Sequence, residues 1–186
     1  MAKDVKQRMT EQMVALLGAK GLDGASFSEV LQGAGAPRGS LYHHFPGGKD
    51  QLVAEALELS ADRAFALLDT LKGRPADEVA RSFIAGWRSA LKRASMDINC
   101  VMMAVTVAAE SPVLRAKAGE IFRAWRARLA DALREGGIGP ERAPALAAGL
   151  IAACEGAVGM ARAEGSLAAF ELMAGEQISA IRAAMT

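Results

Sequence analysis

Apolar side chains recur at intervals of three and four residues along nearly the whole of this 186-residue chain. No segment alternates apolar and polar residues over the length of a strand, and clusters of β-branched residues are scarce. A spacing of three and four places the apolar residues on one face of an α-helix. The pattern therefore predicts an all-α fold of about nine helices, the first of which carries the stripe Val5, Met9, Met13, Leu16 and Leu17.

The composition limits the class of protein. Hydrophobic residues make up 52% of the chain and aromatic residues only 5%, which predicts an aliphatic, alanine-rich core. The 22 Lys and Arg against 21 Asp and Glu leave a net charge of +1, which excludes a histone-like polycation. The two cysteines, Cys100 and Cys154, are too few for a disulfide framework and are expected to be small buried hydrophobic residues in a reducing compartment.

No membrane segment is expected. The longest charge-free stretch in the C-terminal part, Ala143 to Cys154, is shorter than the ~20 apolar residues that span a bilayer. The N-terminal sequence MAKDVKQRMTEQM mixes both signs of charge and lacks the apolar core of a signal peptide. A soluble cytoplasmic protein is predicted.

The segment from Ser26 to Lys49 carries the strongest local signals. Ser26 and Glu29 have the spacing of a capping box, which predicts the start of a short helix that ends at Gly33 and Gly35. Pro37 then opens a third helix, Pro37–Phe45, which Pro46-Gly47-Gly48 stops. The first helix is expected to end at Lys20-Gly21.

Two short helices joined by a glycine-containing turn, and preceded by a longer helix, have the arrangement of a helix-turn-helix. The second of the two helices in that motif enters the major groove of DNA. Leu41 and Phe45 lie four residues apart and are expected to pack on the first two helices. Gly39 and His43 point to the opposite side, with Ser40 beside them and Tyr42 on the flank.

The exposed face of this helix suits DNA. An arginine can pair with phosphate or guanine, hydroxyl groups can donate to phosphate oxygens, and an imidazole can meet a base edge. A glycine permits close approach to the DNA backbone, and a lysine at the start of the next helix adds its charge to that helix's dipole. The predicted DNA-contacting residues are Arg38, Gly39, Ser40, Tyr42, His43 and Lys49.

The string AGAPRGSLYHHFPGGKDQLVAEAL resembles the signature of the TetR family of bacterial transcriptional repressors, and residues 3–57 match that family closely. The resemblance implies a helix-turn-helix DNA-binding domain over residues 1–48, and a helical effector-binding and dimerisation domain over residues 49–186. It also implies a dimer interface in the last two helices. Cys100–Glu110 followed by SPVLRAKAGEIFRAWRARLADAL further resembles the drug-responsive LmrA/YxaF branch.

One feature departs from a typical DNA-binding domain. Residues 1–50 hold six basic and five acidic side chains, so this part of the chain is not strongly basic. Affinity for DNA must then depend on where the individual charges point, and non-specific affinity is expected to be modest.

The C-terminal part offers two further hypotheses. Small residues from Gly149 to Ala157, and an apolar stripe from Phe170 to Met185, suit a two-fold dimer, although both could instead complete the core of one subunit. A mostly apolar effector pocket could be lined by adaptable methionines, aromatic rings and a few polar anchors, although simple core packing explains each residue equally well. The candidates are Phe83, Trp87, Met102, Met103, Thr106, Glu110, Phe122 and Trp125.

Other chemistries find little support. His43 and His44 diverge as adjacent helix positions, and no Cys or carboxylate lies at ligand spacing, so a metal site is not expected there. No cofactor is expected either. Gly47-Gly48-Lys49-Asp50 lacks the other residues and the preceding strand of a phosphate-binding loop. No nucleophile elbow or paired-acid pattern occurs, so the chain is not expected to be an enzyme.

The predicted function is a ligand-responsive transcriptional repressor. It would bind a palindromic double-stranded DNA operator as a homodimer, and a small, largely apolar effector would release it. Two alternatives remain open: a helical ligand-binding or scaffolding protein without DNA binding, and a small helical enzyme.

Overall fold

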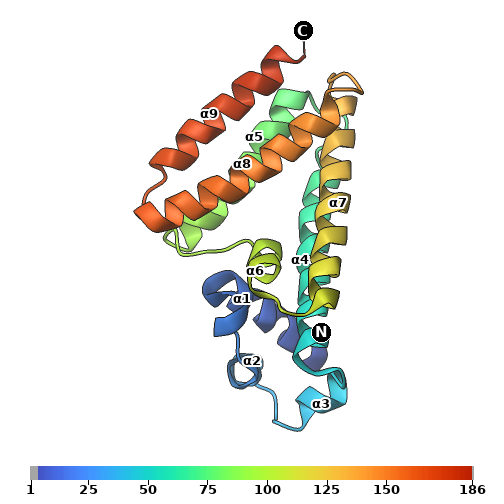
Figure 1. Ribbon diagram of the computed structural model, residues 1–186, viewed down its shortest axis with the longest axis vertical. Coiled ribbons are helices and arrows are strands. Elements are labelled where there is room, and N and C mark those ends of the chain that lie inside the picture. The colour runs from blue at the N-terminus through green and yellow to red at the C-terminus, as the bar shows by residue number, and fades with distance from the viewer. Residues whose placement is uncertain (1–3, 186) are drawn as a thin grey trace. The chain divides into compact units, whose positions relative to one another are not determined.

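The computed structural model describes residues 4–185 and contains only helices, turns and loops in that range (Figure 1). Nine helices are present among these residues, which confirms the predicted all-α class. They are α1 (Val5–Gly24), α2 (Phe27–Ala34), α3 (Ser40–His44), α4 (Gly48–Asp69), α5 (Ala76–Arg93), α6 (Val101–Ala108), α7 (Pro112–Glu135), α8 (Ala143–Glu164) and α9 (Ala168–Ala183).

The described chain forms two compact units. The first contains residues 4–63 and Asn99–Phe122, and the second contains Ala64–Ile98 and residues 123–185. Helices α4 and α7 each contribute residues to both units. The predicted boundary at residue 48 divides a DNA-binding domain from an effector-binding and dimerisation domain. This division by function stays a prediction.

The core of the first unit is built by α1, α2, α4 and α6. The apolar stripe of α1 is buried as its spacing predicts, and Met9, Met13 and Leu17 are fully inaccessible. Helix α1 packs against both α2 and α6. Leu52 and Leu57 of α4 are also fully buried, so removal of these side chains from water holds the helix-turn-helix against its neighbours.

Helix α1 is longer than predicted and interrupted where it was expected to end. It continues to Gly24, but Gly21 has non-helical dihedral angles, φ 71° and ψ −174°. Carbonyls near such a break need donors from elsewhere. The Gly18 carbonyl accepts hydrogen bonds from the backbone N–H and the Nδ2 of Asn99, at 2.7 and 3.2 Å. Glycine at position 21 therefore permits a short final turn rather than ending the helix.

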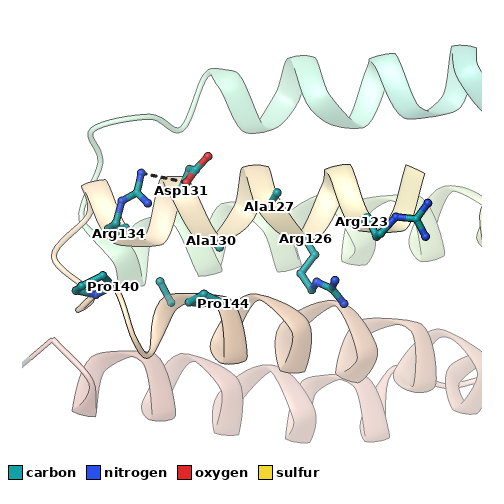
Figure 2. Close-up of a pocket in the computed structure, with 9 residues that line it drawn as sticks. Arg123, Arg126, Ala127, Ala130, Asp131, Arg134, Pro140 and Pro144 are labelled. Carbon is teal, nitrogen blue, oxygen red and sulfur yellow. Dashed lines mark ion pairs between the residues drawn. The ribbon is translucent and has the colours of Figure 1, made fainter. Parts of the chain in front are cut away.

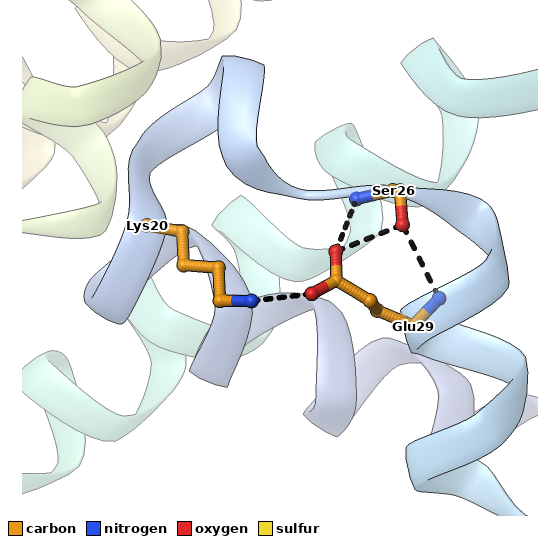
Figure 3. A network of polar contacts seen from close by, with 3 residues as sticks. All are labelled: Lys20, Ser26 and Glu29. Carbon is orange, nitrogen blue, oxygen red and sulfur yellow. Dashed lines mark hydrogen bonds and ion pairs between the residues drawn. The ribbon is translucent and has the colours of Figure 1, made fainter.

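The predicted capping box is present at the start of α2 (Figure 3). The Ser26 hydroxyl oxygen accepts from the Glu29 backbone N–H at 3.3 Å, and the Glu29 carboxylate accepts from the Ser26 N–H and hydroxyl. Lys20 of α1 forms an ion pair with the same carboxylate. These contacts lower the pKa of Glu29 to about 2, chiefly through Lys20 and then through Ser26. The cap thus also joins α1 to α2.

Helix α3 is shorter than the predicted Pro37–Phe45. Arg38 and Gly39 lie in a turn whose hydrogen bonds run from Ser40 N–H to the Pro37 carbonyl and from Leu41 N–H to the Arg38 carbonyl. Bonds over three residues form a tighter turn than the α-helix, and the regular helix begins only at Ser40.

The second unit is a cluster of long helices. Helix α9 packs against α5 and α8, and α8 also contacts α5. Ile84, Leu150 and Phe170 are fully buried in this core. On its surface, the Arg88 guanidinium binds both oxygens of Glu171, at 2.7 and 2.8 Å. This bidentate pair ties α5 to α9 and lowers the pKa of Glu171.

By length and composition alone, α8 is long and apolar enough to cross a membrane, with a mean hydropathy of 1.5 over its most apolar 18 residues. Core helices of soluble proteins can have the same length and apolar composition. Only 39% of that 18-residue window is buried within the chain, so a large part of the apolar helix is left uncovered.

Candidate nucleic-acid interface

Helix α3 presents one apolar and one polar face. Leu41 is 3% exposed and Phe45 is fully buried, as the spacing predicts. Tyr42 is 69% exposed, and His43 is exposed beside it. Two buried side chains one helical turn apart therefore fix α3 to the first unit with its polar face turned to solvent.

The predicted DNA-contacting residues of the turn and of α3 are accessible. Arg38 and Gly39 are exposed in the turn, and Ser40 is half-buried at the start of the helix. No atom lies within 4 Å of where a Cβ on Gly39 would stand, so the space beside this glycine is open. The turn and α3 thus place a guanidinium, two hydroxyl groups and an imidazole along one short surface. Contact of these residues with DNA stays a prediction.

Lys49 has a partner that the sequence did not indicate. It is half-buried, and its ammonium donates to the Leu22 carbonyl at 3.0 Å. That carbonyl belongs to the short turn after the break at Gly21. A lysine has three N–H donors, so this bond holds the side chain without using all of them. Its predicted phosphate contact stays a prediction.

A groove of about 450 Å³ adjoins the turn between α2 and α3. It is lined by Ser28, Leu31, Gln32, Gly35, Ala36, Pro37 and Arg38. Ser28 and Gln32 are exposed polar residues four positions apart on α2, and they are not among the predicted site residues. Ser28 and Gln32 lie on the side of α2 opposite the buried Val30 and Ala34. This helical spacing is the sequence pattern that indicates an outward-facing polar side.

Most basic groups of the first unit are engaged within the protein. Lys6 pairs with Glu55 at 2.9 Å, Lys20 pairs with Glu29, and Arg8 Nε donates to the Ala34 carbonyl at 2.9 Å. Arg38 forms no ion pair with the other described residues of the chain. Positive charge available to a ligand is therefore concentrated at the turn before α3.

Comparison with known proteins agrees with this geometry. Residues 11–56 match the family described as "Bacterial regulatory proteins, tetR family". Residues 75–176 match "Transcriptional regulator LmrA/YxaF-like, C-terminal domain". The chain belongs to the TetR family. This confirms the resemblance noted in the sequence, including its LmrA/YxaF branch.

Relatives and solved structures of TetR regulators match over nearly the full chain. The uncharacterized HTH-type transcriptional regulator MT0206 of Mycobacterium tuberculosis (strain CDC 1551 / Oshkosh) is 32% identical, over 90% of this chain and 89% of its own. The HTH-type transcriptional regulator LmrA of Bacillus subtilis is 26% identical, over 83% and 85%. A TetR transcriptional regulator from Legionella pneumophila shares the fold, with a TM-score of 0.84 at 21% identity over 96% and 98%.

Family membership fixes the general role of the chain. It is a transcription regulator of the helix-turn-helix type. TetR regulators are not enzymes, so the prediction that the chain has no enzymatic activity is confirmed by its family.

The eight residues predicted for an effector pocket divide between the two units of this TetR regulator. In the second unit, Phe83 and Trp125 are buried with ring centroids 5.7 Å apart, and the half-buried Trp87 lies 6.1 Å from Trp125. These three rings form a cluster, here called the aromatic cluster. Its contact with a ligand stays a prediction.

The other five pocket candidates, in the first unit, differ in exposure. Met102 is buried and Phe122 half-buried, whereas Met103, Thr106 and Glu110 are exposed. The Thr106 hydroxyl donates to the Met102 carbonyl of its own helix at 2.8 Å. The exposed side chains of Thr106 and Glu110 are not part of the core, and their role in ligand binding also stays a prediction.

Metal and thiol chemistry gain no support from the described residues. Residues 4–185 contain no group of three His, Cys, Asp or Glu side chains placed to hold a metal ion. Cys100 and Cys154 are both buried, as expected. Burial raises the pKa of the Cys154 thiol to about 12, which keeps it protonated and unreactive near neutral pH.

Proposed function

We propose that this TetR regulator is a homodimeric, ligand-responsive repressor, and that it acts as a soluble protein of the cytoplasm. The observation that carries the proposal is the outward polar face of α3, held by the buried Leu41 and Phe45. Ser40 and Tyr42 would donate to phosphate oxygens, Arg38 would pair with phosphate or guanine, and His43 would meet a base edge.

A dimer would make such a short reading element specific. One α3 covers too few base pairs to select a site, whereas two copies ~34 Å apart would read a palindromic operator in successive major grooves. This geometry is compatible with the nearly balanced charge of residues 1–50, because specificity would come from paired base contacts rather than from a strongly basic surface.

Helices α8 and α9 provide the surface for self-association. On α8, no atom lies within 4 Å of where a Cβ on Gly149, Gly156 or Gly159 would stand. Leu172 of α9 is 79% exposed and Met160 of α8 is 46% exposed. Small residues permit close helix approach, and exposed apolar side chains gain stability when a partner covers them. A two-fold contact of these faces would cover the apolar part of α8.

The aromatic cluster supports an apolar effector. Stacked and tilted aromatic rings provide the large apolar contacts that small-molecule sites commonly use. An effector that binds better to a conformation unsuited to the operator would weaken DNA binding. A coupling free energy of about 1–3 kcal/mol corresponds to a loss of affinity of about 5–150-fold.

A footprint of the purified protein on DNA fragments upstream of its own gene tests the proposal. Tyr42→Ala removes one phosphate donor at an exposed site and is expected to weaken operator binding by about tenfold. Lys49→Ala is expected to weaken binding as well, and sedimentation should show that both variants remain dimers. The matched control is Lys92→Ala, which removes one exposed charge from the second unit.

Two results would contradict this assignment. Equal footprints for wild type, Tyr42→Ala and Lys49→Ala would remove these residues from the interface. Absence of any salt-sensitive DNA shift would instead favour a ligand-binding or scaffolding protein without DNA binding.

A further inference from the structure

A groove lies in the second unit, between the C-terminal half of α7 and the beginning of α8 (Figure 2). Its volume is about 300 Å³, at the lower end of the range for small-molecule sites. The residues that line it are Arg123, Arg126, Ala127, Ala130, Asp131, Arg134, Pro140, Ala143 and Pro144. None of them belongs to α3 or to the aromatic cluster.

The groove has a positive lining. It holds three arginines against one aspartate, and Asp131 pairs with Arg134 at 3.1 Å. Arg123 and Arg126 are exposed, and no ion pair of either is recorded among residues 4–185. In Figure 2 the Arg126 side chain extends from α7 toward α8, so its guanidinium lies along the groove.

The other basic side chains of α7 all have partners. Lys117 pairs with Glu58, Arg128 with Asp69 and Arg134 with Asp131. Arg115 donates to the carbonyls of Ala109 and Glu110. The two arginines without a recorded partner are thus the two that line the groove beside each other, one helical turn apart. Free guanidinium groups on an apolar wall are a surface that an anion would neutralise.

The rest of the lining is apolar and small. Ala127 and Ala130 of α7 line the groove together with Pro140, Ala143 and Pro144 of the loop and first turn of α8. Alanine and proline side chains leave room for a flat body between the two helices and have little conformational entropy to lose when it binds. The N-terminus of α8 adds partial positive charge at the same end of the groove.

We propose that this groove binds a small organic oxyanion, a carboxylate or phosphate ester that carries an apolar body. Arg126 and Arg123 hold its oxygens through charge-assisted hydrogen bonds, since a planar guanidinium matches two oxygens of one group. The apolar body lies on Ala127, Ala130 and Pro144. This site is separate from the aromatic cluster, so its ligand is distinct from the apolar effector of the proposed function.

The groove is also separate from the proposed dimer surface. With about 100° of rotation per residue in an α-helix, Ala143 lies about 120–180° around α8 from Gly149, Ala152 and Gly156, and Pro144 lies about 80–140° from them. A second copy seated on those three small residues would therefore approach α8 from a different side than the groove.

Titration calorimetry with benzoate and phenyl phosphate as probes tests the site in the full-length protein. We expect saturable binding of at least one probe, and the stronger of the two identifies the preferred oxyanion. Arg126→Gln should weaken that binding by about tenfold or more, because it removes a charged hydrogen-bond donor. Arg93→Gln is the matched control, because it removes the same charge from an exposed position at the end of α5 and should leave binding unchanged.

A second variant keeps the charge and fills the space. Ala127→Leu places a larger side chain on the exposed wall of the groove and should also abolish probe binding, while thermal unfolding shows that the variant is folded. Inorganic phosphate has the oxyanion without the apolar body, and benzyl alcohol has an apolar body without the oxyanion. Both should bind more weakly than the probes.

Several outcomes would overturn the site. Equal affinity of the probes for wild type, Arg126→Gln and Ala127→Leu would place their binding elsewhere. A change in the monomer–dimer equilibrium in both groove variants would make the groove part of a contact between copies. If Arg126→Gln lost affinity for the operator but kept its affinity for the probes, Arg126 would be a DNA contact and not part of a ligand site. The footprint of the Tyr42→Ala variant tests DNA binding independently of all three.

Discussion

At the scale of single residues, the first unit uses much of its positive charge to hold itself together. Lys6, Lys20 and Arg8 each bind an oxygen of another helix, and Lys49 binds the carbonyl of Leu22. The charge that remains for DNA lies at Arg38 and at the spare donors of Lys49. A nearly neutral module can therefore still present unpaired positive charge beside α3, the helix proposed to read DNA.

The Lys20–Glu29–Ser26 network predicts a specific pH dependence of stability. The folded-state pKa of Glu29 is about 2, below the ordinary value of 4.5, because Lys20 and Ser26 favour the ionised form. The stabilisation is therefore complete above about pH 4.5 and is lost as the pH falls toward 2. We expect the difference in free energy of unfolding between wild type and Glu29→Gln to shrink over this range in urea titrations.

Lys20→Met should reduce that pH dependence, because the ion pair with Lys20 is the largest cause of the lowered pKa. A difference between wild type and Glu29→Gln that stays constant from neutral pH to pH 2 would show that the network does not form in solution.

At the scale of elements, helix faces could be predicted from the sequence and helix ends only in part. The period of three and four residues identifies the buried sides of α1 and α3, because burial of apolar surface decides which side faces inward. The break at Gly21 depends on tertiary donors, since Asn99 binds the Gly18 carbonyl from 81 positions away. The Lys49 contact follows from that break, so local sequence carries no signal for it.

The junction between the end of α7 and the start of α5 also depends on contacts distant in sequence. A Cβ on Gly136 would lie 2.5 Å from both the Ala76 nitrogen and the Arg74 carbonyl oxygen, and the Gly136 carbonyl accepts from the Ala76 N–H at 3.0 Å. Gly136→Ala must displace backbone and is expected to lower the free energy of unfolding by about 1–3 kcal/mol.

The matched control is Gly139→Ala, because no atom lies within 4 Å of where its Cβ would stand. Chemical denaturation of the two variants compares them directly. Equal stability of both would mean that the close approach of α7 to α5 is relaxed in solution.

At the scale of the whole molecule, the sequence indicates the helical class, the family and the reading helix, but not which apolar surfaces remain uncovered. From the sequence alone, the stripe of small residues on α8 is compatible both with the core of one subunit and with a dimer contact. The burial of individual residues distinguishes the two interpretations. Ala157 is fully buried in the core, whereas Gly149, Ala152 and Gly156 are exposed. One side of the stripe is therefore part of the core. The exposed side, here called the outer edge and made of Gly149, Ala152 and Gly156, is available for a partner.

The outer edge gives the test of assembly. Gly156 is exposed, and a Cβ there would meet no atom within 4 Å beyond the adjoining backbone of α8, so one subunit has room for the leucine of Gly156→Leu. Leucine also favours the helix over glycine by about 1 kcal/mol, so loss of assembly could not be attributed to a weakened α8. We expect sedimentation equilibrium to show monomers for this variant and dimers for Ala85→Leu, which adds a leucine to the exposed side of α5. Because a palindrome needs two reading helices, Gly156→Leu should also lose its operator footprint, while a Gly156→Leu protein that remains dimeric would move the interface away from this face of α8.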